Sequence, residues 1–213
     1  MFMRLIYKIL LFMLSLHISV ALAGSYDDLI TAVKLNDIPA AKALFAKGMD
    51  ANTSDRGANT LLMLAIQNDS EDMVELLLSQ KPPLEARNQY GETALMMAAA
   101  KGKLEQVKHL IEHGAKVNMA GWNPLIYAAW GGQTEVVKHL LNKGADVDAV
   151  APNGISALMM AARGGHFETV KLLLWEVANP NLKSDSGATA MAWALKAGNS
   201  DIVKLLKQAG ATE

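Results

Sequence analysis

Five short segments decide the fold of this chain, and each begins with Thr, Asn or Ser and ends with Ala: Thr60-Leu-Leu-Met-Leu-Ala65, Thr93-Ala-Leu-Met-Met-Ala98, Asn123-Pro-Leu-Ile-Tyr-Ala128, Ser156-Ala-Leu-Met-Met-Ala161 and Thr189-Ala-Met-Ala-Trp-Ala194. Successive segments start 33, 30, 33 and 33 residues apart. Such a period is typical of stacked units that bury their apolar faces only against neighbouring units. The sequence therefore predicts an elongated array whose surface suits the binding of another macromolecule.

The residues around each segment predict a helical hairpin. In the clearest unit, a Gly-bearing turn and a short apolar helix end at Gly102, and a second, amphipathic helix follows. Leu104, Val107 and Leu110 fall at helical spacing in that second helix and make one apolar stripe. Gly114 supplies the left-handed residue that ends the helix.

These motifs resemble those of the ankyrin-repeat family, in which T-P-L-H-x-A-A opens the first helix of each unit. The resemblance covers about residues 25 to 213 and implies an all-α repeat solenoid of about six repeats stacked into a curved array. The first and last units are expected to be caps. The expected units span approximately 25–54, 55–87, 88–120, 121–150, 151–183 and 184–213.

Three departures from the family pattern predict local differences. The signature histidine is replaced by Met63, Met96, Ile126, Met159 and Ala192, so apolar packing is expected in its place. The 30-residue interval before Asn123 predicts one shortened hairpin finger. Val177 stands where other units have Gly, and because a β-branched residue rarely adopts a positive φ, we expect a distorted junction there.

The first 23 residues read as a secretory signal peptide. Arg4 and Lys8 precede an apolar run, and Ala21 and Ala23 fit a small-residue cleavage site. An uncleaved membrane anchor is the alternative, but the 15 residues from Ile9 to Ala23 include polar ones, against about 20 mostly apolar residues needed to span a bilayer. We therefore expect export to the periplasm, or secretion beyond it, of a domain covering residues 24–213 with no membrane insertion after cleavage.

Charge and cysteine content limit the possible partners. Without Arg4 and Lys8 the chain has 18 basic and 21 acidic residues, a formal charge of −3, which gives no reason to expect nucleic-acid binding. The chain has no cysteine, so disulfides and thiolate metal sites are excluded. We expect a monomer that binds another protein of unknown identity.

Partners of the family usually dock on the hairpin tips and on the exposed face of the first helices. Carried over to this sequence, those positions give Tyr90, Trp122, Trp130 and Arg163 as the main candidate cluster, because aromatic residues with arginine are typical of binding hot spots. Further candidates at the same kinds of position are Gln89, Glu92, Lys101, Asn153 and Ile155. Alternatively, Trp122 packs over the shortened turn and Trp130 fills space between helices. Tyr127 and Trp193, at a position shared with Leu64, Met97 and Met160, are expected to belong to the core.

No pattern indicates catalysis, a cofactor or a metal site. The acidic residues near the start of each second helix recur regularly, as expected of groups that complement a helix dipole, and no nucleophile or phosphate-binding motif is present. His109 and His113 stand four residues apart, with His139 at the position of His109 in the next unit, but the Glu of an H-E-x-x-H site is missing.

The sequence thus favours an exported, non-enzymatic protein-interaction module that binds its partner on a concave face, as an envelope scaffold or stress-defence helper. A cognate inhibitor or immunity protein for a toxic periplasmic enzyme is an alternative within that class. A metal- or small-molecule-responsive sensor that uses His109, His113 and His139 is an alternative from another class.

Overall fold

The computed structural model describes residues 26–212, and the expected signal peptide lies outside them. The chain divides into two compact units on either side of the Pro82–Pro83 bond. In the first unit, residues 26–34 are helical and are followed by α2 (Ile38–Ala46), α3 (Leu61–Gln67) and α4 (Glu71–Ser79). Helix α4 packs against both α2 and α3.

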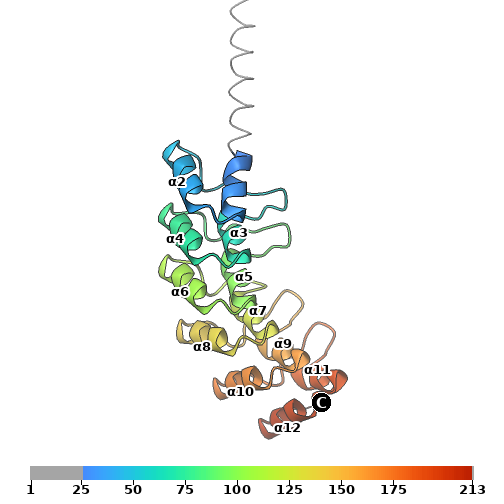
Figure 1. Ribbon diagram of the computed structural model, residues 1–213. Helices are drawn as coiled ribbons and strands as arrows, with labels where there is room; N and C mark the ends of the chain where they lie inside the picture. The colour runs from blue at the N-terminus through green and yellow to red at the C-terminus, as the bar shows by residue number, and fades with distance from the viewer. Residues whose placement is uncertain (1–25, 213) are drawn as a thin grey trace, which may run out of the picture. The chain divides into compact units, whose positions relative to one another are not determined.

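The second unit consists of four consecutive helix pairs. Its helices are α5 (Ala94–Ala100), α6 (Leu104–Glu112), α7 (Pro124–Trp130), α8 (Thr134–Asn142), α9 (Ala157–Gly164), α10 (Phe167–Trp175), α11 (Ala190–Ala197) and α12 (Ser200–Gln208). The first helices of the pairs form one row and the second helices another, with the connecting loops projecting as fingers beside the first-helix row (Figure 1). The predicted all-α repeat fold is thus confirmed.

The polar residue that opens each repeated segment caps a first helix. The side chains of Thr60, Thr93, Asn123, Ser156 and Thr189 each accept a hydrogen bond from the backbone N–H three residues later, at 3.0–3.3 Å. These bonds satisfy one of the free donors at each helix start. Four of the five residues at the signature-histidine position are buried, namely Met63, Met96, Ile126 and Met159, so the predicted apolar packing is confirmed there; Ala192 is exposed.

Second helices end in a left-handed residue, as expected for Gly114, which has a φ of 98°. Val177 takes the same conformation, with a φ of 63°, and its side chain is 82% exposed. The next backbone N–H, of Ala178, still bonds to the Leu173 carbonyl at 3.0 Å, as Ala145 does to Leu140 at 2.9 Å. The predicted distortion is therefore wrong: valine adopts the glycine conformation because its side chain meets solvent there.

Side chains at the turns between paired helices tie neighbouring repeats together. Each of three such side chains contacts a backbone carbonyl at or near the end of the first helix of the previous repeat; they are those of Gln133, His166 and Asn199. The His166 Nε2 atom lies 3.0 Å from the Trp130 carbonyl oxygen. Such lateral bonds fix the register of the first helices, and therefore of any surface that they carry.

The finger before α7 is shortened as the 30-residue interval predicts. Four other fingers are closed by a backbone bond across a four-residue interval, for example from the Asn88 N–H to the Glu92 carbonyl at 3.0 Å. Residues 120–122 form bends instead. Asn118 binds the next finger, because its side chain donates to the Gly144 carbonyl at 2.7 Å and accepts from the Asp146 N–H at 2.9 Å. None of the helices within residues 26–212 is long and apolar enough to cross a membrane.

Candidate protein-binding surface

Three aromatic side chains meet on and beside α7. The Tyr127 ring lies edge-on to both tryptophans, with its centroid 5.9 Å from that of Trp122 and 6.4 Å from that of Trp130. The interplanar angles are 74° and 87°, the T-shaped arrangement that aromatic pairs favour. Trp122 is half-buried and Trp130 is 57% exposed, so the cluster is both ordered and accessible.

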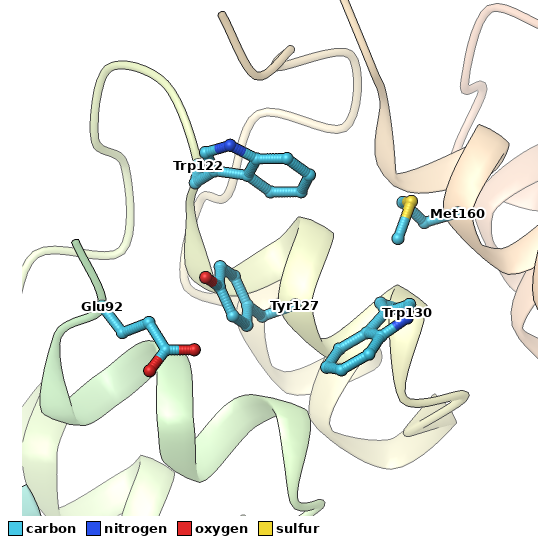
Figure 2. A pocket seen from close by; sticks show the side chains of 5 residues that line it. All are labelled: Glu92, Trp122, Tyr127, Trp130 and Met160. Atoms are coloured by element: carbon cyan, nitrogen blue, oxygen red, sulfur yellow. The ribbon is translucent and has the colours of Figure 1, made fainter. Parts of the chain in front are cut away.

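The three rings line a pocket with Glu92 and Met160 (Figure 2). The shortened finger positions Trp122, α7 positions Tyr127 and Trp130, and α9 contributes Met160. The pocket volume is about 220 Å³. Small-molecule sites usually measure about 300–1,000 Å³, so this one better matches a single side chain of a partner. We call it the aromatic pocket.

Glu92 brings a carboxylate to the aromatic pocket. The amide nitrogen of Asn88 donates a hydrogen bond to Glu92 Oε2 at 2.9 Å. Burial raises the pKa of Tyr127, and so do the charge of Glu92 and the hydrogen bond between the two side chains, with Arg87 opposing. Because the tyrosine is protonated at neutral pH, its hydroxyl donates to the carboxylate.

A second pocket lies one repeat further along the first-helix row. Its lining residues are Arg163, Trp193, Lys196 and Ala197. The Arg163 guanidinium lies 5.4 Å from the centre of the Trp193 ring, within cation–π distance. Trp193 occupies the repeat position of Tyr127, and Arg163 occupies that of Trp130. Here the chain supplies its own cation to a half-buried aromatic ring.

The structure divides the main candidate cluster into three places. Trp122 and Trp130 meet in the aromatic pocket, Arg163 contacts Trp193, and Tyr90 stands 74% exposed on the finger before α5. The four residues therefore do not line one common pocket, because equivalent positions on successive helices are one repeat apart. Of the further candidates, Glu92 enters the pocket, Ile155 is half-buried, and three are exposed: Gln89, Lys101 and Asn153.

The structure also shows how far the two tryptophans are buried, which was the alternative to an exposed binding surface. Trp130 does not fill space between helices, since more than half of its side chain is exposed. Trp122 does pack against α7, through Tyr127, while it lines the pocket. That these residues bind a partner stays a prediction.

Tyr127 and Trp193 were expected in the core, and both lie half-buried at pocket walls instead. Leu64, Met97 and Met160 at the same repeat position are buried. A signal was present in the sequence: a ring with a polar atom at a Leu or Met position needs a hydrogen-bond partner or solvent. Glu92, just before the cap of the preceding first helix, supplies that partner for Tyr127.

The histidines do not gather into a metal site in the described part of the chain. Residues 26–212 hold no group of three or more His, Cys, Asp or Glu that could bind a metal ion. The His113 Nδ1 atom lies 2.8 Å from the His109 carbonyl oxygen of its own helix. His139 is half-buried, and burial lowers its pKa, as do the nearby Lys143 and Lys108 charges.

Comparison with known proteins identifies the family. A model described as ankyrin repeats (3 copies) matches residues 24–88, 82–151 and 125–212, so the chain belongs to the ankyrin-repeat family. Ankyrin repeats are generally non-enzymatic modules that bind other proteins. The resemblance stated from the sequence is therefore confirmed.

Individual relatives share the repeats and differ in length. Rat diacylglycerol kinase zeta is 36% identical over 93 residues, which are 43% of this chain and 10% of the kinase. The putative ankyrin repeat protein YahD of Escherichia coli (strain K12) is 30% identical over 87 residues, or 39% of this chain and 43% of YahD. The chain thus spans less than half the length of these curated relatives.

A solved structure matches over nearly its whole chain. It is a chain of the complex between the predatory endopeptidase Bd0816 from Bdellovibrio bacteriovorus and the immunity protein Bd3460. The TM-score is 0.75 with 30% identity, and the match covers 85% of this chain and 97% of that chain.

Proposed function

We propose that this protein is a non-enzymatic module that captures a protein partner on the first-helix face of its second unit. The observation that carries the proposal is the aromatic pocket, where accessible rings surround a space of side-chain size. Aromatic residues are enriched in the centres of protein interfaces and dominate their binding energies.

The surface is ordered before a partner arrives. Two edge-to-ring contacts hold Tyr127 between the tryptophans, and the His166 contact with the Trp130 carbonyl holds the end of α7 against the next repeat. Ordering loops and side chains at an interface costs about 0.5–1.5 kcal/mol for each immobilised side chain. A preformed surface avoids part of that cost, which favours docking with little rearrangement.

A narrower candidate within this class is an inhibitor or immunity protein for a peptidase. It is supported by the likeness to a chain in the endopeptidase–immunity protein complex, because that likeness extends over 97% of the matching chain. The expected signal peptide is compatible with action in the periplasm. Residues 24–213 would there either inhibit an enzyme or act as an envelope scaffold or stress-defence helper.

Affinity purification tests the proposal. The protein carrying a C-terminal tag is incubated with envelope extract, and retained proteins are identified by mass spectrometry. Trp122→Ala with Trp130→Ala is compared with Trp175→Ala, since Trp175 is 83% exposed at the end of a second helix. We expect one partner to be retained by the wild type and by Trp175→Ala and lost from the double variant.

Retention that is the same for all three proteins would refute the proposed surface. The identity of the retained partner also distinguishes an inhibitor of an enzyme from an envelope scaffold or stress-defence helper. If it is a peptidase, its hydrolysis of a casein substrate is measured with and without this protein. A fall in activity at equimolar protein supports the inhibitor, whereas unchanged activity supports the scaffold.

A further inference from the structure

We infer that the aromatic pocket is a receptor for one cationic side chain, a lysine or an arginine of the partner. The inference rests on the proposed function and names the chemistry that the partner must present. It depends on two features of the aromatic pocket, the rings and the carboxylate of Glu92. It also depends on a comparison with the second pocket, where Arg163 lies on the Trp193 ring.

The rings give the pocket a negative electrostatic lining. Trp122, Tyr127 and Trp130 surround the space from different sides (Figure 2). The faces of aromatic rings attract cations, indole most strongly, and sets of such rings recognise ammonium groups. Met160 completes the lining with one aliphatic side chain.

Glu92 adds a formal negative charge at one side of the same space. Its hydrogen bonds come from the Asn88 amide and the Tyr127 hydroxyl, which are both neutral donors. They orient the carboxylate without neutralising it. Among residues 26–212, no lysine or arginine forms an ion pair with Glu92. An incoming ammonium or guanidinium group would therefore find both ring faces and an opposite charge.

Arg87 is the nearby cation of the chain itself that must be considered. Its charge acts on Tyr127, but its Nη1 atom donates to the Gly91 carbonyl at 2.6 Å. That bond holds Arg87 on its own finger, and it is not among the residues that line the pocket. The pocket can thus accept a cation from outside.

The next repeat shows the same interaction completed within the chain. Arg163 on α9 covers the ring of Trp193 on α11 at 5.4 Å, so this contact joins the first helices of two adjacent repeats. The first-helix face therefore already accommodates a guanidinium on a ring. For Tyr127, which corresponds to Trp193, the residue that corresponds to Arg163 is Ala100 on the preceding first helix, α5. Alanine carries no charge, so the chain supplies no cation from that position and leaves it to a partner.

Small cations test the inference without knowledge of the partner. The probes are Nα-acetyl-arginine amide and Nα-acetyl-lysine amide, with Nα-acetyl-citrulline amide as a neutral analogue of nearly the same shape. Binding to the purified protein is followed by the indole N–H resonances of Trp122 and Trp130 in two-dimensional NMR spectra. The indole resonance of Trp175 serves as an internal reference.

We expect saturable shifts at Trp122 and Trp130 with at least one cationic probe and at least about tenfold weaker binding of citrulline. Glu92→Gln, which keeps the shape of the side chain, should weaken the cation at least about fivefold and leave citrulline unchanged. Tyr127→Leu, which restores the residue type of Leu64 at that repeat position, should also weaken it. Circular dichroism confirms that each variant is folded.

Equal binding of citrulline and arginine, or no saturable shift with either cation, would overturn the inference. Either result would leave the proposed function intact as long as the double tryptophan variant still loses the partner. Conversely, if cations bind the pocket but that variant retains the partner, the proposed docking surface fails and the cation site stands alone.

Discussion

Val177→Gly is expected to stabilise the protein. Val177 has a φ of 63°, and a left-handed conformation costs an L-residue about 1–2 kcal/mol. Its side chain is 82% exposed, so little apolar burial is lost on its removal. Glycine relieves the conformational cost but loses about 0.5–1 kcal/mol through the greater freedom of the unfolded chain. The net gain should be about 0.5–1 kcal/mol in the free energy of unfolding.

Gly144→Val is the matched reverse change in the preceding pair. Gly144 has a φ of 83°, and a Cβ atom added there would meet no heavy atom within 4 Å. Its cost is therefore conformational alone, and we expect a loss similar to the gain at Val177.

Urea unfolding and thermal unfolding, both followed by circular dichroism, measure the free energy of unfolding and the Tm of both variants. In a chain of this size about 1 kcal/mol corresponds to about 2–4 °C in Tm, so opposite shifts of about 1–4 °C are expected. A lower stability for Val177→Gly would refute the reasoning, because it would mean that the valine side chain makes a contact worth more than its backbone conformation costs.

The other predictions concern protonation, capping and the second pocket. Folding lowers the pKa of His139, so the unfolded chain binds a proton at this imidazole more readily than the folded chain does. The contribution of His139 to stability is therefore retained above about pH 6.5 and declines as the pH falls through that value. His139→Gln should flatten the fall in Tm between pH 8 and 5, and an unchanged slope would contradict this. Thr93→Ala removes the cap on the Met96 N–H and should cost about 1 kcal/mol in urea unfolding, whereas Thr93→Ser should cost clearly less. In a double-mutant cycle, Arg163→Ala and Trp193→Leu should show a coupling of about 0.5–1 kcal/mol, and a coupling of zero would exclude the cation–π contact as a stabilising interaction.

The helices could be predicted from the sequence because several local signals agree in every repeat. A capping residue such as Thr93 precedes each first helix from α3 onward, and a left-handed residue such as Gly114 follows each second helix. Between the capping residue and the left-handed residue, the helical spacing of the apolar residues predicts which face of each helix is buried. Repetition makes each signal count several times, which no single motif could do.

The candidate site was predicted less completely, for a physical reason. Glu92, Trp122 and Trp130 were found because a polar or aromatic residue stood at a typical docking position. Tyr127 was assigned to the core because Leu and Met fill its repeat position elsewhere. Whether a ring points into a helix interface or toward a cavity depends on neighbours one repeat away, and the shortened finger changes those neighbours.

The proposed docking surface is tested most directly by isothermal titration calorimetry with the identified partner. Truncation of a hot-spot residue costs about 2 kcal/mol or more, equivalent to about thirtyfold in Kd. For Trp122→Ala with Trp130→Ala we therefore predict a Kd raised at least thirtyfold (about 2 kcal/mol), with an unchanged value for Trp175→Ala. A folded double variant that binds the partner as tightly as the wild type would contradict the assignment of this surface.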